Sequence, residues 1–111
     1  MRATGWGAIL VLVTPKRSMR PFVEEVPELL AERGMSLRAL ARVAGVGHGH
    51  LSRVLRQDAY KTPSAELTAR VAEALGLPAD YFPEFREGFV VQRLREDEAL
   101  RERLYRRLAK G

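Results

Sequence analysis

Three short amphipathic runs follow one another in the first half of this chain, and a glycine ends each of the first two. Apolar residues recur every three or four positions in each run, which predicts three helices, over residues 23–33, 37–44 and 48–56. Gly34 and Gly45 stand where a helix commonly ends in the left-handed conformation that glycine adopts easily. Only Val46 and Gly47 separate the second run from the third. Helices joined by so short a connection must cross at a steep angle.

The pattern continues with a fourth helix. Thr62-Pro63 is expected to start it, because proline fits the first helical position, where its missing N–H costs nothing. Its buried stripe is predicted to consist of Leu67, Val71, Ala74 and Leu75, and Gly76 closes it. Residues 77–82 are expected to form a last short helical turn that lays two aromatic side chains over the core. Residues 21–85 are therefore expected to form one helical domain.

The second and third helices each have one apolar face. Ser36 is placed to cap the second helix, whose inward residues are Leu37, Leu40, Ala41 and Ala44. In the third helix, Leu51, Val54 and Leu55 are expected to face inward. This leaves five residues of the third helix on the outside: His48, Gly49, Ser52, Arg53 and Arg56.

Two stretches closely resemble the lambda-repressor/Cro-like helix-turn-helix family of bacterial and phage regulators: SLRALARVAGVGHGHLSRVLRQ (36–57) and TPSAELTARVAEALGLPADYF (62–82). The resemblance covers about sixty of the 111 residues. It implies an all-α fold, a five-helix helix-turn-helix domain followed by a C-terminal amphipathic helical extension. A small residue is needed where the two helices of the motif pack closely, and Ala41 provides it. The expected motif core is Leu40, Ala41, Gly45, Val46, Leu51 and Val54.

The resemblance also implies a function, because the family places its third helix in the major groove of double-stranded DNA. His48, Gly49 and Arg53 fall at the base-reading positions, and the planar fork of Arg53 can bind guanine O6 and N7 together. The expected phosphate contacts are Arg38, Ser52, Arg56, Gln57 and Lys61. The chain is thus expected to be a sequence-specific transcriptional regulator, a repressor that occupies its operator as a homodimer.

Two features depart from the family pattern. The family often has glutamine at the position of Leu37, where glutamine supports base and phosphate contacts that leucine cannot make. Gly47 and Gly49 each lower helix propensity by about 1 kcal/mol relative to alanine, which favours a late start of the third helix. The basic excess, with a net charge of +5, lies in the two ends, while residues 21–60 carry five basic and five acidic side chains. These features leave open a protein-interaction module that has kept the fold without binding DNA.

Other kinds of site find little support. His48 and His50 diverge on a helix, and with no cysteine and no third histidine we expect neither a metal site nor a cofactor. Ser52, His50 and Asp58 lack any recognisable catalytic pattern, so we do not expect an enzyme. The absence of cysteine fits a reducing cytoplasm.

The first twenty residues differ from the rest. Residues 6–13 are apolar and β-branched but far too short to span a membrane, and no cleavage site of a secreted protein follows them. Residues 1–20 are therefore interpreted either as a strand-like arm or as an extension upstream of a protein that starts at Met19.

Residues 86–111 form a second amphipathic region, in one or two helices. Its apolar stripe is a candidate dimer face that comprises Leu94, Leu100, Leu104, Tyr105 and Leu108. The same stripe would equally extend the core of the domain. A further alternative is a partner protein bound through residues 86–111, as in antitoxin-type regulators.

Overall fold

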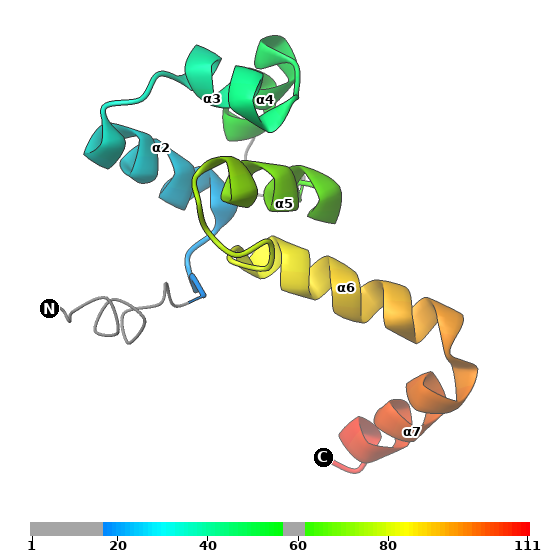
Figure 1. Ribbon diagram of the computed structural model, residues 1–111. Coiled ribbons are helices and arrows are strands. Elements are labelled where there is room, and N and C mark those ends of the chain that lie inside the picture. The colour runs from blue at the N-terminus through cyan, green and yellow to red at the C-terminus, as the bar shows by residue number, and fades with distance from the viewer. Residues whose placement is uncertain (1–16, 57–61) are drawn as a thin grey trace, which may run out of the picture.

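The computed structural model describes residues 17–56 and 62–111, and this part of the chain forms helices and no strand (Figure 1). The all-α prediction is therefore confirmed. In chain order the helices are α2 (Phe22–Arg33), α3 (Leu37–Ala44), α4 (His48–Arg56), α5 (Ala65–Ala74), α6 (Pro83–Glu96) and α7 (Glu98–Ala109). The expectations for residues 1–16 lie outside the described residues.

The boundaries of α2 and α3 follow the predicted signals. Gly34 and Gly45 end these helices with φ angles of 61° and 73°, in the left-handed region. Ser36 Oγ accepts a hydrogen bond from the Ala39 N–H at 3.0 Å, which caps α3 as predicted. The third helix does not start late: α4 begins at His48 and includes Gly49, because packing of its apolar face outweighs the low propensity of one glycine.

Two other predicted boundaries are wrong. The fourth helix begins at Ala65, after Ser64, whose hydroxyl accepts a hydrogen bond from the Leu67 N–H at 3.1 Å. A serine at this position caps the helix better than a proline start would, so Pro63 stays outside it and is buried. Residues 77–82 form no further helix but contain one turn, in which the Tyr81 N–H donates to the Pro78 carbonyl at 2.9 Å, and Tyr81 and Phe82 pack on the core as predicted. Pro83 at the start of α6 keeps Phe82 extended, at φ −88° and ψ 143°.

The core lies between α2, α3, α4 and α5, and Phe82 closes it. Phe82 and Phe22 are both fully buried, and their rings meet edge to face with centroids 4.9 Å apart. The other fully buried side chains among the largest are Leu40, Leu51, Val26, Val71 and Thr68. In the predicted stripe of α5, Leu67, Val71 and Leu75 are buried, while Ala74 is only partly buried and Ala72 is fully buried instead.

The start of α6 is tied to the start of α2 by polar contacts. Both carboxylate oxygens of Glu84 accept from the Phe22 N–H, at 3.0 and 3.2 Å, so Glu84 caps a helix whose own N-cap residue, Pro21, offers no side-chain acceptor. Arg86 donates to the carbonyl oxygens of Asp80, Tyr81 and Ser18 at 2.8, 2.9 and 2.7 Å. These contacts hold the first turn of α6 against the domain.

A hydroxyl–carboxylate pair strengthens this region. The Tyr81 hydroxyl donates to Glu25 Oε2 at 2.8 Å, which links the turn before α6 to α2. Burial raises the pKa of the Tyr81 hydroxyl above its ordinary value, and the Glu25 carboxylate acts in the same direction. The hydroxyl therefore remains protonated and able to donate at neutral pH.

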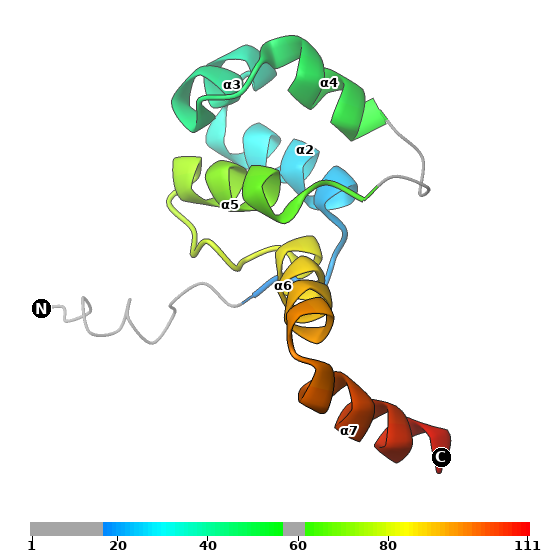
Figure 2. The ribbon, with the colours of Figure 1, turned by 90° about the vertical axis from the view of Figure 1, so that its right-hand side faces the viewer.

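The second half of α6 and all of α7 lie away from the core. Gly88 still packs closely on α5, where an added Cβ would come within 3.1 Å of Ala65 Cβ. Beyond that point no residue of α6 or α7 is buried, so the apolar stripe of residues 94–108 does not extend the core. Figures 1 and 2 place α3 and α4 at one end of the molecule and α7 at the other, along a body whose longest dimension is 49 Å. Within the described ranges, no helix has the length and apolar character needed to cross a membrane.

Replacing Glu84 with alanine should lower the free energy of unfolding by about 1–2 kcal/mol, because the buried Phe22 N–H loses its charged acceptor. Urea denaturation measures this change. Glu87→Ala is the control, since Glu87 is an exposed acid on the same helix. Equal stability of the two variants would contradict the capping role of Glu84.

Candidate nucleic-acid interface

The turn between α3 and α4 sets the direction of α4. Gly45 adopts a positive φ, and the Val46 N–H then donates back to the Ala41 carbonyl at 3.0 Å. From α5, Arg70 Nη1 donates to the Gly45 carbonyl at 3.3 Å, while its Nη2 pairs with Glu66 at 2.9 Å. Contacts from α3 and α5 therefore fix this turn, which sets the orientation of α4.

The inner face of α4 packs on the core through apolar side chains alone. Leu51 is fully buried, Val54 is 5% exposed, and Leu55 packs partly against the same cluster. From α3 they meet Leu40 and Ala41, which are 0% and 2% exposed. Of the expected motif core, Val46 is half-buried, and Gly45 is exposed at the turn. The motif residues thus lie together between α3 and α4.

The outer face of α4 presents the residues assigned to base reading. His48 is half-buried, whereas Gly49 and Arg53 are exposed, one turn apart. Arg53 Nη1 lies 3.5 Å from the point where a Cβ on Gly49 would stand, so its guanidinium folds back over the glycine. The absence of a side chain at residue 49 therefore leaves Arg53 room to lie along α4 or to extend from it.

The residues assigned to phosphate contacts border this face. Ser52 is half-buried and Arg56 is exposed on α4, and Arg38 is exposed in the first turn of α3. Gln57 and Lys61 lie outside the described residues. Leu37 is half-buried and packs against the core, so it contributes to stability where the family often has a polar contact residue.

The outer face of α4 is weakly basic. The sequence of α4 contains two arginines and no acid, and its N-terminal N–H groups add positive potential near His48. A small open cavity of about 220 Å³ lies beside it, lined by Val46, His50, Ser64, Glu66, Leu67 and Arg70. In the described ranges, no three histidine or carboxylate side chains gather as metal ligands would. The arrangement is suited to contacting a groove edge and its phosphates.

Some contacts that shape this face were not evident from sequence. The Glu66–Arg70 pair has the spacing of a helical ion pair and could have been found. The hydrogen bond from Arg70 to Gly45 could not, because it joins α5 to the turn between α3 and α4, 25 positions away.

Comparison with known families gives one match: residues 28–82 fit the model described as "Helix-turn-helix". The matched segment begins within α2, contains α3, α4 and α5, and ends at Phe82, directly before α6. No curated protein and no solved structure matches the chain.

Substitution of Gly45, before α4, and of Gly49, within α4, should have different effects on stability. Gly45→Ala should lower the free energy of unfolding by about 1 kcal/mol or more, because alanine resists the positive φ. Gly49→Ala should be neutral or raise it by up to about 1 kcal/mol, since residue 49 is helical and an added Cβ makes only ordinary contact with Arg53. Thermal or urea denaturation of both variants measures the difference, and a stable Gly45→Ala protein would contradict the account of the turn.

Proposed function

Because residues 28–82 form a helix-turn-helix domain of the lambda-repressor/Cro-like family, we propose that this protein is a sequence-specific transcriptional repressor that reads its operator with α4. The family is one of DNA-binding regulatory domains that bind double-stranded DNA, and it is not a family of enzymes. In this proposal the protein works in the cytoplasm by occupying the operator and needs no cofactor.

The observation that carries the proposal is the exposed outer face of α4, held by a rigid turn and a buried inner face. Arg53 is the base-reading residue with the best chemistry, because an extended guanidinium reaches two acceptors of guanine at once. His48 adds a donor or an acceptor, and Gly49 allows the groove wall to approach the helix. Arg38, Ser52 and Arg56 border the same face and would hold phosphates, together with Gln57 and Lys61.

The proposal includes a homodimer formed through residues 86–111. Tyr105 and Leu108 are 66% and 68% exposed on α7, and Phe89 is 57% exposed on α6. Between the two helices lies an open apolar cavity of about 300 Å³, lined by Phe89, Val90, Arg93, Leu94, Leu100 and Leu104. Removing such an apolar surface from water is favourable, and an isologous contact between two copies of the chain would do so.

The shape of the molecule limits how this dimer can bind one operator. Since α4 and α7 lie at opposite ends, a two-fold axis along the longest dimension keeps both α4 helices at the same end (Figure 2). Such a dimer presents two reading helices to one duplex, with half-sites about 34 Å apart.

A second candidate function rests on the same exposed stripe. An antitoxin-type regulator would use Leu94, Leu100, Leu104, Tyr105 and Leu108 to bind a different protein instead of a second copy. A monomer in solution that still binds an operator, and a partner that co-purifies through α7, would favour it.

Arg53→Ala should weaken binding to the operator, identified by selection from random duplexes, by about 1–3 kcal/mol and weaken non-specific binding much less. Fluorescence anisotropy with operator and scrambled duplexes measures both affinities. Arg95→Ala is the control, because it removes an exposed arginine on α6, far from α4. Equal losses on both duplexes would move Arg53 to the phosphate contacts.

Deleting residues 97–111 should convert the dimer into a monomer while the helix-turn-helix domain stays folded, since α7 makes no buried contact with it. Light scattering gives the mass, and circular dichroism checks the fold. An unchanged mass would rule out dimerisation through α7.

A further inference from the structure

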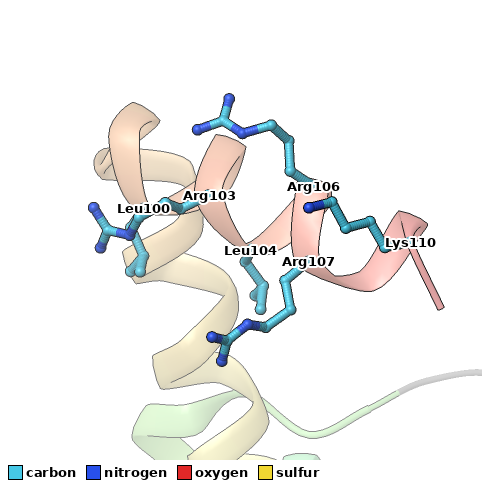
Figure 3. A pocket seen from close by; sticks show the side chains of 6 residues that line it. All are labelled: Leu100, Arg103, Leu104, Arg106, Arg107 and Lys110. Atoms are coloured by element: carbon cyan, nitrogen blue, oxygen red, sulfur yellow. The ribbon is translucent and has the colours of Figure 1, made fainter.

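Four cations gather on one side of α7. Arg103, Arg106, Arg107 and Lys110, with Leu100 and Leu104, line an open cavity of about 520 Å³ that contains no acidic side chain. Figure 3 shows the four cationic side chains spread around the two leucines, all from α7. Hereafter these four residues are called the α7 basic cluster.

The cations of the α7 basic cluster form no ion pairs with carboxylates of the described residues, unlike the neighbouring Arg101. Arg101, on the same helix, pairs with Glu102 at 3.2 Å and with Glu98 at 3.8 Å. Within the described part of the chain, no ion pair involves any of the four clustered cations. Their charge is therefore available to an anionic partner.

The spacing of the cluster costs helix stability. Residues 103 and 106, 103 and 107, 106 and 110, and 107 and 110 are three or four positions apart, so their like charges are neighbours on the helix surface. One or two cations in the last turn would suffice to complement the helix dipole. An anion bound along this side would relieve the repulsion, which a free helix has to bear.

We propose that the α7 basic cluster is a second DNA-binding surface, which holds the phosphate backbone of a duplex without reading its sequence. Three of the four cations are arginines, whose planar forks suit phosphate oxygens. The cluster spans about 10 Å along the helix, from residue 103 to residue 110, so it can contact several phosphates of one duplex. When the four cations contact phosphates, only Leu100 and Leu104 remain in the cluster's cavity, and neither can hydrogen-bond a base.

Double-stranded DNA fits these observations better than a bilayer or an acidic protein. A helix that lies on a membrane turns its apolar face to the lipid, whereas Leu100 and Leu104, which line the cavity of the cluster, are half-buried and also line the cavity shared with α6. An acidic protein segment would need shape as well as charge, and the cluster is open. DNA needs only cations at a suitable spacing, and the helix-turn-helix domain already brings the chain to DNA.

The α7 basic cluster lies far from the outer face of α4. Because α7 lies at the opposite end from α4, the duplex that it holds is a different segment from the one that α4 reads (Figures 1 and 2). One molecule then joins two stretches of DNA, which binding through α4 alone would not do.

The test compares two double variants with equal loss of charge. Arg103→Gln/Arg107→Gln removes two clustered cations, and the control Arg95→Gln/Arg101→Gln removes two cations outside the cluster. Binding to a scrambled duplex is measured by anisotropy over a range of salt concentrations, with helicity checked by circular dichroism. Each lost phosphate contact reduces the magnitude of the slope of log K against log[salt] by about 0.9. The slope should therefore decrease in magnitude by about 2 in the cluster variant and change little in the control.

The same comparison is repeated in an Arg53→Ala/Arg56→Ala background, where DNA binding by the outer face of α4 is weakened. The effect of the cluster variant should persist there, so the result does not depend on whether an operator exists. Equal slopes for the two double variants, or an effect that vanishes in this background, would overturn the proposal. So would a cluster variant that loses binding to phosphatidylserine vesicles while its DNA slope is unchanged.

Discussion

The structure depends on how α4 is packed against α3 and α2. Leu51 and Val54 are buried against Leu40 and Ala41, and this contact is reached only because the chain reverses at Gly45 with a positive φ. Arg70 then holds the carbonyl of that glycine from α5. Burial of the inner face of α4 and exposure of its outer face are thus two results of one turn. The outer face of α4 is held in place because the inner face of the same helix is part of the core.

The polar contacts at the start of α6 mark where the domain ends along the chain. Glu84 caps α2, and Arg86 binds the carbonyl groups of Ser18, before α2, and of Asp80 and Tyr81, after α5. The first turn of α6 therefore stabilises the domain, while the rest of α6 carries α7 away from it. This separation leaves α4 at one end of the molecule, and α7, with its exposed apolar stripe and its basic cluster, at the other.

Much of the fold could be predicted because its signals are local. Ser36, Gly34 and Gly45 act within one turn of the helices that they bound, so the limits of α2 and α3 follow from sequence. The start of α5 was predicted too early, because Pro63 also fits the start of a helix and Ser64, the observed cap, directly follows it. Glu84 and Arg70 could not be assigned, since their partners are 62 and 25 residues away. The base and phosphate contacts remain predictions, because they depend on a partner's geometry.

Selection of binding sites from a random pool of duplexes, carried out at two salt concentrations, tests the central claim most directly. The account predicts recovery of an inverted repeat whose half-sites are about one helical turn apart, retained at the higher salt. Recovery of no preferred sequence, with retention that disappears as salt is raised, would show that α4 does not read bases. That result would contradict the assignment of this protein as an operator-binding repressor.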